Sequence, residues 1–286
     1  MTDIRRLLAG DEKTRAWVEY LEGLGEPDIE VALPLADDLP PVLIELAVPH
    51  EDIDVLIRML PSRGRTSLWW LVQRCAETVM SGMGVVGRPP SFPQLPASLG
   101  VLGRYFYVYA FLAVLPHVQA FHRSRGIPED ISRLTLADLG RQLALNRRWH
   151  GVGGLDDAFW LTLHFRGAIY QLGRLQFQRT RLGNRAGTAI AAAGGPYGPG
   201  DPALAVHVPG CYGPLTPAAC DEALRVAKQF FVRHFPEENY PIAVCESWLL
   251  DDQLAEYLPA EANIIQFQRR FRLAHRSGPA DEPILR

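Results

Sequence analysis

The spacing of apolar residues changes midway along the chain, and this change limits the folds that the chain can adopt. In the first half, apolar side chains recur at helical intervals, as Ile4, Leu7 and Leu8 do. Further along, Leu175 and Phe177 alternate with polar residues, which is typical of a half-buried β-strand. The sequence therefore predicts an all-helical first part and a second part that contains a sheet.

The first part reads as a series of helices. Two short apolar stretches, 39–49 and 51–61, end in proline, as short helices often do. The run 105–118 is the most apolar in the chain, but it contains Pro116 and is shorter than the about 20 residues that cross a bilayer. We therefore expect a buried core helix over 98–122 and no membrane partner.

A glycine-rich segment separates the two patterns of apolar spacing. The helix before it is expected over 135–150, where Thr135 and Asp138 have the spacing of a capping box. We therefore expect a helical domain over 1–150 and a second domain over 151–286.

Strand and helix patterns are mixed in the second domain. Segment 158–170 fits a helix or a strand equally well. Helices are expected over 216–235 and 251–259. Strands are expected over 171–182, within 187–202, and over 203–209, 241–248 and 262–275. The predicted fold class is α+β, with an all-helical N-terminal domain before a mixed sheet with flanking helices.

The charge and cysteine content exclude several functions. The formal net charge is −3 and basic residues are spread along the chain, so no strong field attracts nucleic acid or an anionic membrane. In 262–275, the apolar Ile265, Phe267 and Phe271 read as core and the arginines as an exposed face. The 4 cysteines form no disulfide-like framework, and the charged N-terminus is unlike a signal peptide. We expect a cytoplasmic protein.

One stretch, 206–231, has the pattern of a strand, a loop and an amphipathic helix. Thr216 is a good N-cap and Pro217 suits the first helical position. Gly210 and Gly213 would let a ligand approach the backbone, and a helix N-terminus attracts anions. These features fit a phosphate-binding loop.

Other features of this stretch fit a capped turn instead. Pro214 removes one backbone donor from the loop, and Asp221 and Glu222 would compete with a bound anion. The chain has neither a GxGxxG nor a GxxxxGK[ST] motif here. Residue spacing alone leaves both interpretations open.

The order of elements in the second domain resembles the second half of the GCN5-related N-acetyltransferase (GNAT) fold. The set LGRLQFQ, GPLTPAACDEAL, FFVRHFPEENY, CESWLLDDQL and NIIQFQRRFRL is similar to a bacterial acyltransferase-domain family with a helical N-terminal domain and a GNAT-like C-terminal domain. The resemblance implies acetyl-CoA or another acyl-CoA as donor substrate. The residues it implies for CoA binding are Val208, Gly210, Cys211, Tyr212, Gly213, Leu215 and Thr216.

The loop of this chain departs from the GNAT pattern. Standard GNAT loops carry Q/R-x-x-G-x-G/A, whose successive amides hold the pyrophosphate, whereas 210–214 reads Gly-Cys-Tyr-Gly-Pro. Two functions are therefore kept. The first is an acyl-CoA-dependent N-acyltransferase, with acetyl as the expected group and a small-molecule or peptide amine as acceptor. The second is a non-catalytic GNAT-like protein that binds CoA, another nucleotide or a protein partner.

Two residues are candidates for the base that takes the amine proton. His207 lies on the strand that would border the thioester, and its ordinary pKa near neutrality suits a base. The alternative is a histidine that faces solvent. Glu246 lies where the two strands would part, and it can act as a base through water; the alternative is a helix-capping or surface role.

The remaining candidates have weaker support from the sequence. Tyr212 and Tyr240 are the nearest phenols that can protonate a leaving thiolate, and packing is the alternative for both. Cys245 lies between apolar strand residues, which is typical of a buried, inert thiol. His207, Cys211 and Cys220 lack the spacing of a zinc site, so no metal is expected.

Overall fold

The structure is a computed structural model that describes residues 3–25, 29–64 and 66–274. The chain divides into two compact units, Met1–Gly167 and Ala168–Arg286. This division lies further along the chain than the boundary expected at residue 150. The segment after Gly151 includes a helix that packs within the first unit, and the first strand of the sheet begins only at Ile169.

All the regular elements among the described residues of the first unit are helices. Its helices form where one face is apolar, and several begin at a residue whose side chain caps the first turn, such as Asp11 and Thr66. The helices are α1 (Ile4–Gly10), α2 (Glu12–Gly23), α3 (Leu39–Glu45), α4 (His50–Arg58), α5 (Ser67–Met80), the 3₁₀ helix η1 (Ala97–Leu99), α6 (Gly100–Ser124), α7 (Glu129–Leu136), α8 (Asp138–His150) and α9 (Ala158–Phe165).

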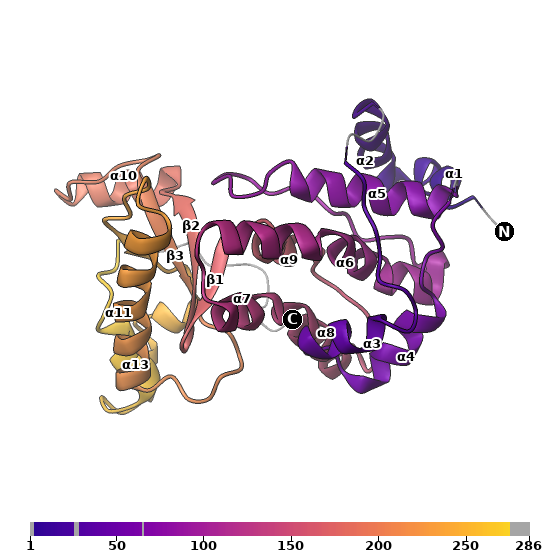
Figure 1. Ribbon diagram of the computed structural model, residues 1–286. Helices are drawn as coiled ribbons and strands as arrows, with labels where there is room; N and C mark the ends of the chain where they lie inside the picture. Colours follow the sequence, from indigo (N-terminus) through magenta and orange to yellow (C-terminus); the bar gives the residue numbers. More distant parts are fainter. Residues whose placement is uncertain (1–2, 26–28, 65, 275–286) are drawn as a thin grey trace. The chain divides into compact units, whose positions relative to one another are not determined.

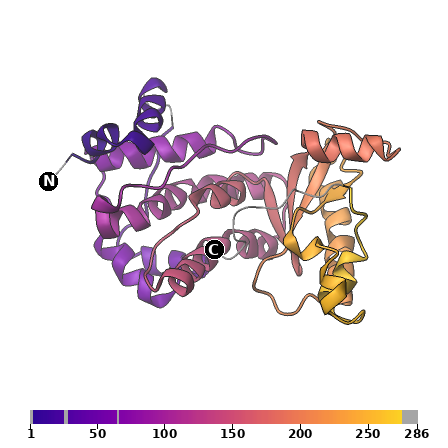
Figure 2. The same ribbon diagram turned by 180° about the vertical axis from the view of Figure 1, so that it is seen from behind.

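Helix α6 is the core of this unit and confirms the expected buried helix. It runs through the middle of the helices in both views (Figures 1 and 2), and every residue from Tyr105 to Leu115 is buried. Its neighbours include α5, α7 and α9. By length and composition alone Ala97–Ser124 could cross a membrane, but 61% of its most apolar window is buried inside the protein, as in the core helix of a folded domain.

The second unit contains a four-stranded sheet with the order β1-β2-β3-β4. The first three strands are antiparallel and β3 pairs with β4 in parallel, so the sheet is mixed as predicted. The strands are β1 (Ile169–Leu172), β2 (Leu175–Arg181), β3 (Pro202–His207) and β4 (Ala243–Val244). The helices are α10 (Asn184–Ala192), α11 (Pro217–His234), the 3₁₀ helix η2 (Trp248–Leu250), α12 (Leu254–Tyr257) and α13 (Asn263–Gln268).

Helix α11 lies along one face of this sheet, and α13 lies beside it (Figures 1 and 2). Tyr170 of β1 meets Phe230, Phe231 and Phe235 at ring-centroid distances of 4.9, 6.2 and 5.7 Å. Aromatic burial of this kind fixes the helix on the strands. This packing holds the C-terminal end of α11 against the sheet.

The sheet also buries a charged residue. Arg179 of β2 forms an ion pair with Glu238, and its guanidinium lies 4.1 Å from the ring centre of Phe235. Strand β2 is also buried on both faces over Leu175–Phe177, including Gln176, whereas the alternation predicted a strand buried on one face only. A buried cation requires such a partner because desolvation is costly.

Several expectations for individual elements were wrong. The possible strand within 187–202 is instead the end of helix α10, consistent with the high helix propensity of its alanines. The strand expected over 262–275 begins as helix α13, in which Phe267 and Phe271 stack at 5.1 Å; His275 lies outside the described residues. Thr135 lies inside α7, and α8 begins after Ala137 without a side-chain cap.

Candidate functional site

The loop between β3 and α11 ends at the predicted helix cap. Thr216 is the N-cap of α11, its Oγ1 accepts a hydrogen bond from the amide of Ala219 at 3.3 Å, and Pro217 is the first helical residue. The helix is 18 residues long, so its N-terminus carries the partial positive charge of a full helix dipole. The predicted strand–loop–helix unit is thus present.

The parallel pairing of β3 with β4 stops before β3 itself ends. The ladder joins Leu204 to Ala243 and Ala205 to Val244, whereas β3 continues to His207. Strand β4 is only 2 residues long, although a strand over 241–248 was predicted. The backbone of β3 beyond Ala205 therefore has an edge that β4 does not cover.

The loop backbone is open where the sequence places its glycines. A Cβ atom built on Gly210 or Gly213 would meet nothing within 4 Å. Among the described residues, none accepts a hydrogen bond from the amide of Gly210 or Gly213. Tyr212 and Gly213 both have left-handed backbone conformations, with φ of 70° and 77°. A ligand can therefore approach the backbone at this loop.

The side chains of the loop divide into anchors and exposed groups. Leu215 is buried and fixes the end of the loop, whereas Val208 and Cys211 are partly buried. Tyr212 has 36% of its surface exposed. Together with Gly210, Gly213 and Thr216, these residues complete the set that the resemblance implied for CoA binding.

Two arginines that the sequence analysis missed contact this loop and helix start. Arg174, in the turn between β1 and β2, donates hydrogen bonds to the carbonyl oxygens of Pro209 and Gly213, both at 2.9 Å. Arg270, which follows α13, donates to the carbonyl of Pro217 at 3.0 Å and to Asp221 at 2.8 Å. No local pattern identifies them, because their partners lie tens of residues away.

His207 is partly buried and is oriented by a neighbouring strand. Its Nε2 donates to Oε1 of Gln178 on β2 at 3.0 Å. A neutral imidazole with its proton on Nε2 carries its lone pair on Nδ1. The strand therefore holds a histidine whose second nitrogen can accept a proton.

Glu246 is exposed and lies two residues beyond the end of β4. Its neighbour Cys245 is partly buried, and burial, with a smaller contribution from the Glu246 carboxylate, raises the pKa of the Cys245 thiol to about 12. A thiol in that state is protonated at neutral pH and is a poor nucleophile. This agrees with the expectation that Cys245 is inert.

Tyr240 contacts the buried ion pair between Arg179 and Glu238. Its hydroxyl donates to Glu238, and the same hydroxyl accepts from Nε of Arg179 at 3.3 Å. Burial, followed by the hydrogen bond to Glu238, raises the pKa of Tyr240 well above its ordinary value. The contacts of Tyr240 are therefore those of a structural residue.

The described residues contain no group of three or more His, Cys, Asp or Glu side chains able to hold a metal ion. Cys220 is buried in the first turns of α11. Burial raises the pKa of its thiol, and the guanidiniums of Arg270 and Arg174 lower it by smaller amounts. Both positive charges therefore lie close to the start of α11.

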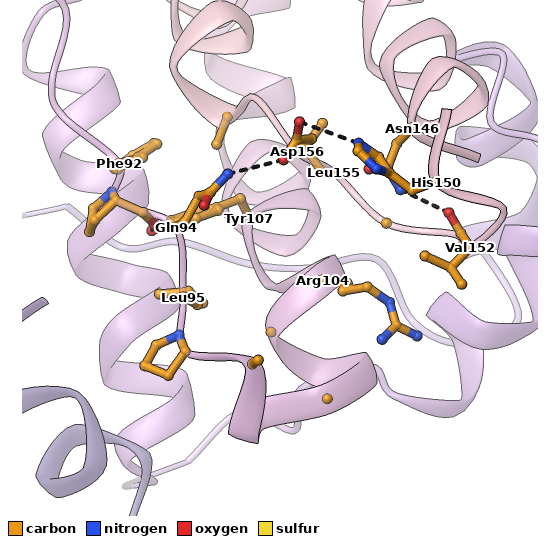
Figure 3. A pocket seen from close by; sticks show the side chains of 17 residues that line it. Phe92, Gln94, Leu95, Arg104, Tyr107, Asn146, His150, Val152, Leu155 and Asp156 are labelled. Carbon is orange, nitrogen blue, oxygen red and sulfur yellow. Dashed lines mark hydrogen bonds and ion pairs between the residues drawn. The ribbon is translucent and has the colours of Figure 1, made fainter. Parts of the chain in front are cut away.

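A cavity of about 320 Å³ lies within the helical unit (Figure 3). Its walls combine apolar side chains such as Phe92 and Tyr107 with polar ones at the rim. There, Oδ1 of Asp156 accepts a hydrogen bond from Nε2 of Gln94 at 3.1 Å, and Oδ2 of Asp156 lies 3.7 Å from Nε2 of His150. None of the predicted site residues lines this cavity.

Comparison with known proteins gives matches across both units. A model of the N-acyltransferase N-terminal domain matches residues 37–167, and a model of the GNAT-like C-terminal domain matches residues 169–286. A search of curated proteins found no match.

Solved structures of similar proteins cover almost the whole chain. One is an acyltransferase in complex with decanoyl-CoA and teicoplanin, with 38% identity, a TM-score of 0.87, and coverage of 99% of this chain and 83% of the other. Another is a mutant acyltransferase in complex with octanoyl-CoA, with 39% identity, a TM-score of 0.86, and coverage of 96% and 81%. A third is an acyltransferase in complex with decanoyl-CoA, with 39% identity, a TM-score of 0.83, and coverage of 93% and 79%.

The order of the two matched domains agrees with the helical unit followed by the mixed sheet, and with the resemblance found in the sequence. At this identity and coverage the likeness extends beyond the fold. The chain therefore belongs to the acyltransferase family that joins an N-acyltransferase N-terminal domain to a GNAT-like C-terminal domain.

Proposed function

We propose that this protein transfers an acyl group from acyl-CoA to an amine of a small molecule. The observation that carries the proposal is the likeness, over 93% or more of the chain, to acyltransferases that bind octanoyl-CoA or decanoyl-CoA. The open loop between β3 and α11 supports it, because exposed amides beside a long helix N-terminus suit a diphosphate.

The proposed donor is an acyl-CoA with a chain of medium length. Acetyl-CoA was the donor expected from the sequence, but the similar structures contain octanoyl or decanoyl groups. For the acceptor, we propose an amine of a teicoplanin-type compound, since similar acyltransferases were solved with teicoplanin and with 10C-teicoplanin. The peptide amine considered from the sequence is the alternative acceptor.

The reaction requires one bond to form and one to break. The amine nitrogen attacks the thioester carbonyl, a C–N bond forms, the C–S bond breaks, and CoA leaves as a thiolate that takes up a proton. We assign removal of the amine proton to His207, because its Nε2 is held by Gln178 and its Nδ1 can accept. Glu246, exposed beyond β4, is the alternative base acting through water.

Release of the CoA thiol tests the activity directly. Acetyl-, octanoyl- and decanoyl-CoA are each incubated with the protein and a teicoplanin-type compound that carries a free amine. We expect acceptor-dependent thiol release, faster with the octanoyl and decanoyl donors than with acetyl-CoA. If CoA binds but no donor is turned over with any amine tested, the protein is a GNAT-like binding protein instead.

Substitution of the two candidate bases tests the roles of His207 and Glu246. His207→Asn should lower kcat by about a hundredfold or more, as loss of a general base does. Glu246→Gln should have a small effect if His207 is the base. His117→Asn is a matched control, since it changes another partly buried histidine, on α6. The reverse order of effects at 207 and 246 would assign the base to Glu246.

A further inference from the structure

We propose that Arg174 is a positioning residue for acyl-CoA, holding the loop 208–216 in the conformation that receives the diphosphate. This inference rests on the proposed function, because it explains how a loop that lacks the usual glycine pattern presents its amides. It concerns a residue outside the loop and outside the set predicted from the sequence.

Arg174 joins the two ends of the loop. Its Nε donates to the carbonyl of Gly213 and its Nη1 to the carbonyl of Pro209, each at 2.9 Å. A guanidinium offers several donors in one rigid plane, so a single side chain fixes the spacing between the two carbonyls. A lysine at this position would offer a single flexible ammonium, which does not fix the spacing of two carbonyls.

The conformation of the loop needs such support. Tyr212 and Gly213 are both left-handed, and a residue with a Cβ atom pays about 1–2 kcal/mol to adopt that region. A strained backbone persists only where its surroundings hold it in place. The bond from Arg174 to the carbonyl of Gly213 acts directly after the strained residue Tyr212.

The bond to Pro209 also sets the direction of an amide. The chain has no cis peptide bond among its described residues, and in a trans peptide the C=O and N–H point in opposite directions. Because the carbonyl of Pro209 points at Arg174, the amide of Gly210 points away from it. That amide has no acceptor among the described residues, and the space around Gly210 is open. Arg174 thereby turns a donor outward, where an anion can accept it.

Arg174 is itself held firmly in the turn between β1 and β2. Gly173 has a left-handed φ of 63°, and the side-chain Nε2 of Gln171 donates to the carbonyls of Gly173 and Leu175 at 2.8 and 3.2 Å. A Cβ atom on Gly173 would lie 3.7 Å from Ala223, so this turn packs against α11. The turn, the loop and the helix start therefore form one braced unit.

Three variants separate this role from simple loss of charge. Arg174→Ala removes both bonds, and Arg174→Lys keeps the charge without the planar pair of donors. Arg225→Ala is the matched control, because it removes an arginine from the exposed surface of α11, where that residue pairs with Glu222. Titration calorimetry gives the Kd for CoA, and steady-state kinetics gives KM and kcat for decanoyl-CoA.

We expect Arg174→Ala to raise the Kd for CoA and the KM for decanoyl-CoA about tenfold, because the loop must be ordered at the moment of binding. The kcat at saturation should stay within about twofold, since Arg174 contacts no reacting atom. Arg174→Lys should resemble Arg174→Ala, and Arg225→Ala should resemble the wild type. A Kd for Arg174→Ala or Arg174→Lys equal to that of the wild type would overturn the proposal.

Hydrogen exchange without any ligand distinguishes this proposal from the proposed function. Amides within 208–216 should exchange faster in the Arg174 variants than in the wild type, while those of α5 should not change. If exchange in the loop is unaltered, Arg174 does not hold the loop and the inference is wrong. If the loop is loosened but the wild type binds no CoA, the proposed function fails, and the assignment of this loop to acyl-CoA fails with it.

Discussion

The two units of the chain hold their polar groups in different ways. In the helical unit, Asp138 and His164 are buried, and Asp138 accepts hydrogen bonds from Arg141, Gln142 and Trp160. In the second unit, the loop before α11 is largely exposed and is tied down by the side chain of Arg174. Substitutions of buried polar residues in the first unit should therefore mainly affect stability, and substitutions at the loop should mainly affect acyl-CoA binding.

The largest expected effect is at Asp138. Asp138→Ala should lower the free energy of unfolding by about 3–5 kcal/mol, because it leaves the buried His164 without its charge partner and three partly buried donors without their acceptor. Chemical denaturation followed by tryptophan fluorescence measures it, since all the tryptophans except Trp248 lie in the first unit. Asp54→Ala is the control, because Asp54 forms an exposed ion pair with Arg58. Its loss should lower the free energy of unfolding by less than about 1 kcal/mol.

If Asp138→Ala and Asp54→Ala destabilise the protein equally, the contrast between a buried network and an exposed surface is wrong. Enzyme kinetics tests the same difference between the helical unit and the loop. Asp138→Ala, measured where it is still folded, should change the KM for acyl-CoA less than Arg174→Ala does.

The second expected effect is a pH dependence that comes from the helical unit. Burial lowers the pKa of His122 from 6.5 to about 4, and its Nδ1 lies 2.7 Å from Ser132. Below pH 6.5 the unfolded chain binds a proton that the folded protein excludes. The contribution of His122 is therefore complete above pH 6.5 and is lost as the pH falls towards 4, by about 3 kcal/mol in total.

Denaturant unfolding measured between pH 7 and pH 5 tests this contribution before most carboxylates titrate. The wild type should lose stability over this range, and His122→Asn, which can still hydrogen bond to Ser132, should lose less. Equal slopes for the two proteins would show that His122 does not titrate as its burial requires.

The smallest expected effect is at the helix cap of the loop. Thr216→Ala removes the hydrogen bond to the amide of Ala219 and should cost about 1 kcal/mol of stability. Thr216→Ser keeps a hydroxyl and should be close to the wild type. Thermal unfolding, followed by circular dichroism at several denaturant concentrations, compares the free energies of unfolding of the two variants and the wild type. A loss in Thr216→Ser as large as that in Thr216→Ala would exclude the cap as the cause.

The elements that could be predicted from the sequence are those with strong local signals. Helix α11 begins at the Thr216–Pro217 pair, and the core helix and strand β3 lie where their patterns placed them. The single strand expected over 171–182 was right only for β2, because a turn at Gly173 and Arg174 separates β2 from the end of β1. The short elements were harder. Ile265 and Phe267 fit a strand by alternation, yet they belong to a helix of 6 residues, and a run this short has no decisive period.

The site was predictable only in part, because side-chain contacts across the fold leave little trace in the local sequence. Arg179 shares the strand face of Leu175 and Phe177, so the alternation did contain a signal for a buried cation. Arg174 gave no such signal, because its partners Pro209 and Gly213 meet it only when the turn packs against α11.

Hydrogen exchange of the wild type with and without decanoyl-CoA shows whether the loop before α11 is the acyl-CoA site. Bound decanoyl-CoA should slow exchange in the loop 208–216 and in the first turn of α11. A tight complex in which this segment is unchanged, or the absence of any binding at millimolar decanoyl-CoA, would contradict the assignment of the loop as the acyl-CoA site.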